Sequence, residues 1–124
     1  MKLLTHNMLT SKAIKKVNTG YPLLIEARDV KVSEVEFNPD FISRIIPKVD
    51  WDCLRRAAEQ LGHLDDLPQA TPANYENDED FLKKAHHALL EIELINGNLV
   101  CPETSRKFPV SDGIPNMLLN EDEI

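Results

Sequence analysis

Residues 99–119 read LVCPETSRKFPVSDGIPNMLL, and this stretch decides the fold that the sequence predicts. It follows Asn96-Gly97, a pair that supplies the positive φ angles of a two-residue hairpin turn. We therefore expect residues 91–95 and 98–101 to form a hairpin. A third strand is predicted over residues 107–110, after which residues 111–113 turn the chain into its apolar end. The C-terminal quarter is thus predicted to be antiparallel β structure.

Upstream of this quarter the hydrophobic period changes to that of helices. Asn38 is a good N-cap and is followed by Pro39, which suits the first helical position. Asp50 is placed to cap a second helix that Gly62 would stop. A third helix is expected to begin at Asp78, with acidic residues near its positive end. The middle of the chain is therefore predicted to be helical.

The remaining segments complete a prediction of the α+β class. Residues 23–37 alternate apolar with charged residues and contain neither Gly nor Pro, so one or two strands are expected there. Residues 65–77, which contain prolines and scattered polar residues, are predicted to form a loop. Both chain ends, 1–36 plus 90–124, would form a small antiparallel β subdomain. Residues 37–89 would form a helical insertion subdomain.

The charge of the chain argues against nucleic-acid binding. Its 124 residues carry a formal net charge of −7 and show no basic stripe, so the electrostatic attraction that dominates nucleic-acid affinity is missing. Lys12, Lys15 and Lys16 form the one basic cluster, and a solvated loop accounts for them. A stand-alone RNA-binding module that uses these lysines remains the alternative, and a steep salt dependence of RNA binding would favour it.

Neither a secretory leader nor a membrane-spanning segment is predicted. Polar residues interrupt the apolar N-terminus, and no apolar run reaches 18 residues. We therefore expect a soluble, intracellular protein. Its two cysteines, Cys53 and Cys101, are expected to be free and buried rather than part of a disulfide framework.

Metal and nucleophile chemistry are both poorly supported. Cys101-Pro102-Glu103-Thr104 looks like a C-P-x-C zinc knuckle, but Thr104 stands where the second cysteine would be. His86 and His87 are adjacent, so on a helix they point about 100° apart and would not share one ion. The sequence has no Gly-x-Ser-x-Gly turn and no glycine-rich phosphate loop. These absences favour a docking protein over a catalyst.

The positive signal is an apolar segment that suits the edge of a sheet. Pro115 removes a backbone donor from residues 114–119, and an apolar edge needs a cover. Another protein could add a strand there, or Met117, Leu118 and Leu119 could fold back onto the core of the chain. The apolar N-terminus, residues 1–9, must also be buried, either in this chain or in a partner.

Several stretches, in their order and spacing over the full length, resemble one known family. The chain is similar to the eukaryotic multifunctional methyltransferase-activating subunit, the tRNA methyltransferase 112 subunit family. The stretches are Met1-Lys2-Leu3-Leu4-Thr5-His6-Asn7, Val35-Glu36-Phe37-Asn38-Pro39, Ile46-Pro47-Lys48-Val49, Cys101-Pro102-Glu103 and Gly113-Ile114-Pro115-Asn116-Met117-Leu118-Leu119.

The resemblance implies a non-catalytic, obligate regulatory partner of S-adenosylmethionine-dependent methyltransferases. These enzymes act on tRNA, on 18S rRNA at guanine N7 and adenine N6, and on a glutamine of the translation termination factor. They would bind the cofactor, so none is expected in this chain. No direct contact with nucleic acid or membrane is expected. The resemblance also implies a location in the cytoplasm and the nucleus.

The resemblance also implies a fold and a contact set. The fold would be a zinc-ribbon-like β subdomain with a helical insertion. Some family members hold zinc with four cysteines, and this chain lacks those ligands, so a zinc-free version is expected. The implied partner-binding residues lie at both ends of the chain and are Leu4, His6, Asn7, Leu9, Ile114, Pro115, Asn116, Met117 and Leu118. Contact would be made by strand addition and an apolar patch.

Overall fold

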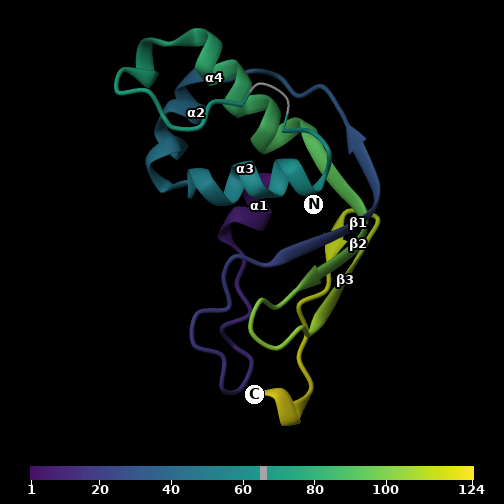
Figure 1. The fold of residues 1–124 in the computed structure, drawn as a ribbon. Helices are drawn as coiled ribbons and strands as arrows, with labels where there is room; N and C mark the ends of the chain where they lie inside the picture. Colours follow the sequence, from purple (N-terminus) through teal and green to yellow (C-terminus); the bar gives the residue numbers. More distant parts are fainter. Residues whose placement is uncertain (65–66) are drawn as a thin grey trace.

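The computed structural model describes residues 1–64 and 67–124 and shows a mixed α+β fold. In this part of the chain, four antiparallel strands form one sheet in the order β1-β2-β3-β4. Figure 1 shows the larger helices gathered beside one end of the long strands, while β3 pairs with the other end. The elements are α1 Leu3–Met8, β1 Leu24–Val32, α2 Pro39–Ile45, η1 Ile46–Lys48, α3 Trp51–Gln60, η2 Tyr75–Asn77, α4 Glu79–His86, η3 His87–Glu91, β2 Ile92–Val100, β3 Lys107–Ser111, β4 Ile114–Pro115 and η4 Glu121–Glu123.

The three predicted helices are confirmed together with their caps. The side chain of Asn38 accepts a hydrogen bond from the Phe41 backbone N–H at 3.1 Å and begins α2. Asp50 and Asp78 do the same for α3 and α4, at 3.1 and 3.0 Å. Each cap satisfies a helix N–H that has no partner within the helix, which is why these short polar residues set the helix starts.

Two segments differ in detail from simple helix and loop. The helix that begins after Asp78 continues beyond α4 as a π-helical turn, η3, before the chain enters β2. The predicted loop 65–77 ends in the short 3₁₀ turn η2. Its first two residues, 65 and 66, lie outside the described residues.

The predicted hairpin at Asn96-Gly97 is wrong. β2 runs without interruption from Ile92 to Val100, and both residues lie inside it, opposite β1. Glycine is needed here because a Cβ on Gly97 would lie 2.2 Å from the backbone oxygen of Glu26. The glycine therefore serves a close approach of two strand backbones, not a turn. The side chain of Asn96 donates to Asp29 across the pair at 2.9 Å.

The tight hairpin turn lies further along the chain. Asp112 and Gly113 connect β3 to β4 with φ angles of +51° and +77°. Positive φ at both central residues is the geometry that Asp-Gly pairs favour in two-residue hairpins. The turn predicted over residues 111–113 is thus confirmed.

The core lies between the helices and one face of the sheet. Ile25, Leu99 and Phe108 are paired across β1, β2 and β3, and each is at most 8% exposed. Helix residues such as Leu54 and Leu89 are fully buried in the same cluster. Both cysteines are buried and free, as predicted. Other core members include Leu3, Leu23, Ile42, Ala58, Ala85, Ile92, Leu94 and Val110.

The N-terminal segment is helical and packs inside the chain. The Met1 amine donates to Leu94 O at 2.7 Å, and Lys2 forms a bridge with Glu93, so the first residues extend the sheet along β2. Helix α1 then contacts α3 and η3. The N-terminal segment was expected to be buried either in this chain or in a partner. Its core-facing residues are buried in the chain itself. The division into two subdomains at residues 37–89 stays a prediction.

Across residues 1–64 and 67–124, no helix combines the length and the apolar character that crossing a bilayer requires.

We expect Gly97→Ala to destabilise the fold by about 1–3 kcal/mol, the typical effect of forcing atoms into a packed site. The reason is the 2.2 Å approach of the added Cβ to Glu26 O, a backbone atom that cannot move aside alone. Urea unfolding measures the change. Gly62→Ala is the control, because its added Cβ meets nothing within 4 Å and only the positive φ of +76° opposes it. A Gly97→Ala variant as stable as the unmodified chain would contradict the close approach of the two strands at this residue.

Candidate docking site at the last strand

Strand β4 forms one edge of the sheet. It pairs with β3 through Val110↔Pro115 and Ser111↔Ile114, and within the described residues no further strand lies beyond it. Ile114 is 70% exposed. Pro115 is tolerated because an edge strand does not require every backbone donor. The edge position predicted from Pro115 is confirmed.

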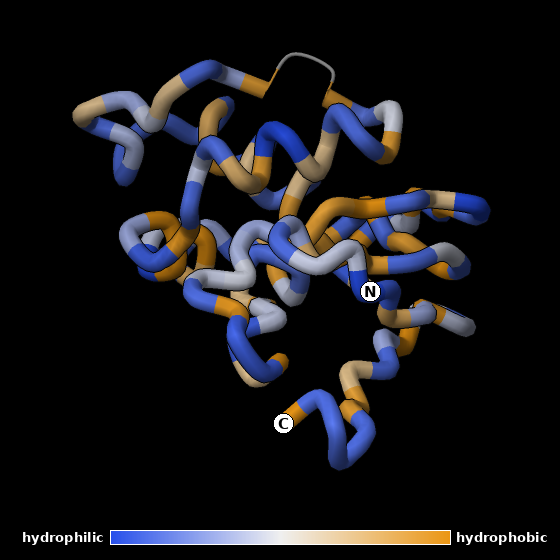
Figure 2. The backbone as a smooth tube through the Cα atoms, turned by 60° about the horizontal axis from the view of Figure 1, so that its bottom comes forward, coloured by the Kyte–Doolittle hydropathy of each residue, from blue (hydrophilic) through white to orange (hydrophobic). Residues whose placement is uncertain are grey.

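The chain beyond β4 alternates between outward and inward side chains. Leu118 is 80% exposed, whereas Met117 and Leu119 are partly buried against the core. The backbone is fixed by a hydrogen bond from Asn116 N to Pro109 O at 2.9 Å and by one from Leu118 N to Asn116 Oδ1 at 3.1 Å. In Figure 2 the chain that leaves the sheet toward the C-terminus has both orange and blue parts, and a hydrophilic turn precedes its apolar end. Met117 and Leu119 thus fold back onto the core, as one alternative had it, whereas Leu118 does not. The addition of a strand from another protein stays a prediction.

The predicted contact residues of the N-terminus fall into two groups. Leu4 and Leu9 are half-buried and pack against the core. His6 and Asn7 are only 2% and 4% exposed. These two lie inside the chain, where a partner would not reach their polar atoms directly.

His6 and Asn7 hold the N-terminal helix in place. His6 Nε2 is 2.7 Å from Leu23 O, at the start of the sheet. Asn7 makes a reciprocal pair with the backbone of Asp50, through Asn7 Nδ2 to Asp50 O at 2.9 Å and Asp50 N to Asn7 Oδ1 at 3.0 Å. Since Asp50 caps α3, Asn7 ties α1 to the start of that helix.

The two predicted contact segments begin close together beside β2. Gly113 N donates to Ile95 O at 2.9 Å, next to the Met1–Leu94 pair. A Cβ on Gly113 would lie 3.1 Å from Met1 N, so the β3–β4 turn directly adjoins the N-terminus. The structure thereby places the start of α1 and the start of the apolar tail on one side of β2.

The opposite edge of the sheet, β1, has the features of a protected edge. Glu26, Arg28, Asp29 and Lys31 are all exposed along it, and the register shifts around Asp29. Charges and irregularities of this kind discourage the addition of another strand. The Ile25 N–H is also occupied, because it donates to Gln60 Oε1 of α3 at 3.1 Å. β4 is thus the more accessible edge.

Glu103 is a structural residue that the sequence did not single out. Its carboxylate accepts hydrogen bonds from the backbone N–H groups of Asn18, Thr19 and Gly20, at 3.0, 2.9 and 2.7 Å. These bonds lower the pKa of Glu103 and join residues 101–106 to the loop before β1. No sequence signal reveals such a contact, because the partners are more than 80 residues apart.

Within the described residues, no group of three or more His, Cys, Asp or Glu side chains is arranged to hold a metal ion. Thr104 is exposed at the knuckle and Cys101 is 1% exposed. Ser11 and Thr104 are the side chains that hydrogen-bond to the Cys101 thiol and lower its pKa, against the opposing effect of burial. The loop and the knuckle are therefore joined by hydrogen bonds in this structure.

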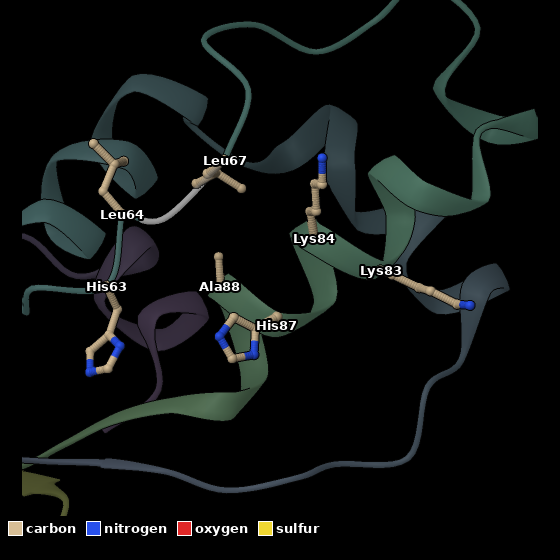
Figure 3. A pocket seen from close by; sticks show the side chains of 7 residues that line it. All are labelled: His63, Leu64, Leu67, Lys83, Lys84, His87 and Ala88. Carbon is tan, nitrogen blue, oxygen red and sulfur yellow. The ribbon is translucent and has the colours of Figure 1, made fainter.

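A separate cavity of about 250 Å³ lies between the end of α3 and α4, away from β4. Figure 3 shows its lining, which is His63, Leu64, Leu67, Lys83, Lys84, His87 and Ala88. His87 Nδ1 is 2.7 Å from Glu91 Oε1, and Lys83 pairs with Glu79 at 3.3 Å. The described lining residues include two histidines and two lysines but no Ser, Cys or Thr.

The basic cluster considered as an RNA-binding alternative lies in the loop between α1 and β1. Lys12, Lys15 and Lys16 are all exposed there, as a solvated loop would place them. They lie among buried neighbours such as Ile14 and Val17, which anchor the loop to the core.

Comparisons with known proteins agree with one another. The model of the Trm112p-like protein family matches residues 2–113. A multifunctional methyltransferase subunit TRM112 homolog A from Arabidopsis thaliana is 55% identical, covering 100% of both chains. A TRM112-like protein of the same description from Mus musculus is 50% identical over 123 residues, covering 99% of this chain and 98% of its own.

The fold is also similar to that of a solved chain in the E. cuniculi Mtq2–Trm112 complex, described as responsible for methylation of the eRF1 translation termination factor. The TM-score is 0.60 at 18% identity, and 95% of each chain is covered. At this identity the likeness supports the fold.

We expect the folded state to lose stability as the pH falls below about 6.5, because of His6. Burial lowers the pKa of its imidazole, and the hydrogen bond to Leu23 O opposes this only in part. Below pH 6.5 the imidazole is protonated in the unfolded chain but not in the folded chain. The free energy of unfolding therefore falls by at most about 1.4 kcal/mol per pH unit. Urea unfolding at pH 7.5 and 5.5 measures the difference. His6→Gln keeps a donor for Leu23 O and should show a smaller difference; an equal one would exclude His6 as the cause.

We also expect Glu103→Gln to loosen the loop before β1. The amide group keeps one acceptor oxygen and replaces the other with an NH2 donor, which would face at least one of the N–H groups of residues 18–20. The amide hydrogens of these residues should therefore exchange severalfold faster. Glu121→Gln removes a charge from an exposed position of the tail and is the matched control. Unchanged exchange at residues 18–20 in the Glu103 variant would mean that the carboxylate does not hold the loop.

Proposed function

The chain belongs to the Trm112p-like family, and on this premise we propose that it is a non-catalytic subunit that activates and stabilises S-adenosylmethionine-dependent methyltransferases. Relatives that are 50–55% identical over their full length are described as multifunctional methyltransferase subunits. The structural neighbour was solved in complex with Mtq2. The partner would hold the cofactor and carry out the reaction.

One observation about this chain carries the proposal: β4 is an accessible strand edge with apolar side chains beside it. Ile114 and Leu118 are 70% and 80% exposed, and both are within five residues of each other. A partner strand that added to this edge would gain backbone hydrogen bonds and cover these side chains. Such an exposed apolar edge is otherwise an aggregation hazard.

The proposed contact set has an exposed centre and a half-buried rim. Ile114, Pro115, Asn116 and Leu118 would form the centre, since Ile114, Asn116 and Leu118 are exposed and Pro115 is in the edge strand itself. The half-buried side chains Leu4, Leu9 and Met117 would contribute their accessible parts. His6 and Asn7 would act from inside, by holding α1 beside the edge.

The range of partners is the finer part of the proposal. We propose methyltransferases that act on tRNA, on 18S rRNA at guanine N7 and adenine N6, and on the glutamine of the termination factor. The word "multifunctional" in the relatives' descriptions and the eRF1 methylation ascribed to the Mtq2–Trm112 complex support this range. Activity on tRNA, rRNA and a translation factor would require the protein in both cytoplasm and nucleus.

Activation would follow from mass action, with no residue of this chain in the active site. A subunit that binds only the folded methyltransferase stabilises it by about 2.7 kcal/mol when its concentration is a hundredfold above the dissociation constant. The covered apolar surface would also protect the enzyme from aggregation. The apolar edge of this chain would thus cover an apolar surface that the methyltransferase exposes when it is alone. The zinc-ribbon-like description of the β region remains part of this proposal.

The test is the double variant Ile114→Asp, Leu118→Asp. Two charges on the proposed face should abolish co-purification with a Mtq2-type methyltransferase, because each buried, unpaired carboxylate would oppose binding by several kcal/mol. Both side chains are exposed, so the variant should unfold at the temperature of the unmodified protein. Co-expression, affinity purification and thermal unfolding measure these outcomes.

Val32→Asp is the matched control. Val32 is 46% exposed at the end of β1, the opposite edge, and should tolerate a charge without loss of the partner. Retained co-purification of the Ile114, Leu118 double variant would rule out the β4 edge as the docking site. If Val32→Asp abolished co-purification and the Ile114, Leu118 double variant did not, docking would be assigned to β1 instead.

A further inference from the structure

An ion pair joins the C-terminal tail, residues 116–124, to the sheet. Arg106 Nε is 2.7 Å from Glu123 Oε2, and Arg106 Nη2 is 3.2 Å from Glu123 Oε1. Two parallel bonds of this kind fix both planar groups in orientation as well as in distance. The side chains are 30% and 18% exposed, so the pair is partly shielded from water. The hydrogen bond from Arg106 lowers the pKa of Glu123.

Arg106 is itself anchored to the core. Its guanidinium carbon lies 4.7 Å from the centre of the Phe108 ring, and Phe108 is 1% exposed. A cation stacked on a buried aromatic ring gains electrostatic attraction and loses rotational freedom. The guanidinium is therefore a fixed point on the sheet, to which the tail is attached.

The same pair of residues organises the backbone of the tail. Arg106 Nη2 also donates to Leu118 O at 3.4 Å, and Glu123 Oε1 accepts from Asn120 N at 2.9 Å. On the other side, the backbone oxygen of Glu123 accepts from Lys15 N in the loop before β1. The segment that carries the exposed Leu118 is thus held from both of its ends.

We propose that Arg106 and Glu123 are positioning residues that latch the tail in the conformation a methyltransferase binds. This inference rests on the proposed docking function of residues 114–118. A chain end without such contacts frays, and its ordering would then have to accompany binding. The latch removes that ordering from the binding step, so its loss should weaken binding without changing the contact surface.

An ordinary surface ion pair would behave differently. Exposed pairs contribute little to stability, and removing one leaves the neighbouring backbone as ordered as before. Lys107 and Glu26 form such a pair on the strands next to Arg106, at 3.2 Å and with side chains 58% and 49% exposed. Lys107→Gln is therefore the matched control, because it removes one positive charge beside Arg106 without touching the tail.

The first measurement uses the chain without a partner. In Arg106→Gln and in Glu123→Gln, ¹⁵N relaxation should show residues 117–123 becoming mobile, while the order of β2 and β3 is unchanged. The variants should agree with each other, and Lys107→Gln should match the unmodified chain. A tail as ordered in both variants as in the unmodified chain would overturn the latch.

The second measurement is the dissociation constant for a Mtq2-type methyltransferase. Arg106→Gln and Glu123→Gln should each weaken binding roughly tenfold, and the double variant should weaken it no further, since both remove one latch. Unfolding temperatures near that of the Lys107→Gln control would exclude a general loss of stability. Unchanged affinity in both single variants, or additive losses, would overturn the proposal.

The latch and the docking function fail separately. If Ile114→Asp, Leu118→Asp abolishes binding while the Arg106 and Glu123 variants bind normally, docking stands and the latch as a positioning device is wrong. If the Ile114, Leu118 double variant binds normally, the docking site is wrong, and the role of the latch in binding falls with it. The relaxation data would still decide whether the pair orders the tail.

Discussion

The structure depends on one close approach, that of the β1 and β2 backbones at Gly97. The glycine lets β2 continue past Glu26 as a single nine-residue strand. Because the strand is continuous, it has room for β1 along one side and for both β3 and the first two residues along the other. A hairpin at this point would have divided the strand and left the N-terminus without a place in the sheet. The edge position of β4 is a consequence of this arrangement.

Carboxylates join the parts of the chain that strands and helices leave loose. Glu103 binds three backbone N–H groups of the loop before β1, and Glu123 binds Arg106 and, through its backbone, the same loop. Each carboxylate is ionised and accepts hydrogen bonds from several donors, and such charge-assisted bonds are stronger than those between neutral groups. They explain how a loop and a tail without strand or α-helix structure still take defined paths near β4.

The two edges of the sheet differ in a way that bears on function. β1 is long but carries exposed charges, a shift in register and a side-chain cap from α3. β4 is short, contains a proline and is followed by an exposed leucine. A protected edge and an apolar edge in one sheet are what a protein needs if it is to add a strand from one partner and avoid indiscriminate association.

Local signals in the sequence were sufficient for the starts of three helices, α2, α3 and α4, and for part of the site, but not for α1. Asn38, Asp50 and Asp78 mark helix starts because a cap needs only the next three residues, and Pro115 marks an edge because its ring removes a donor wherever it stands. Asn96-Gly97 misled for the same reason: its preference for a turn is local, whereas the close approach of Glu26 comes from a strand 70 residues away. The burial of His6 and Asn7 likewise depends on distant partners, since His6 bonds to Leu23 O and Asn7 to the backbone of Asp50.

The sequence by itself therefore determined the class of fold, the starts of α2, α3 and α4, the apolar chain ends and the family. Tertiary structure alone decided that β2 is continuous, that His6 and Asn7 point inward, and that Glu103 and Arg106 hold the loop and the tail. The physical reason is range: caps and prolines act on the neighbouring backbone, while strand pairing and charge-assisted contacts depend on groups that only the folded chain brings together.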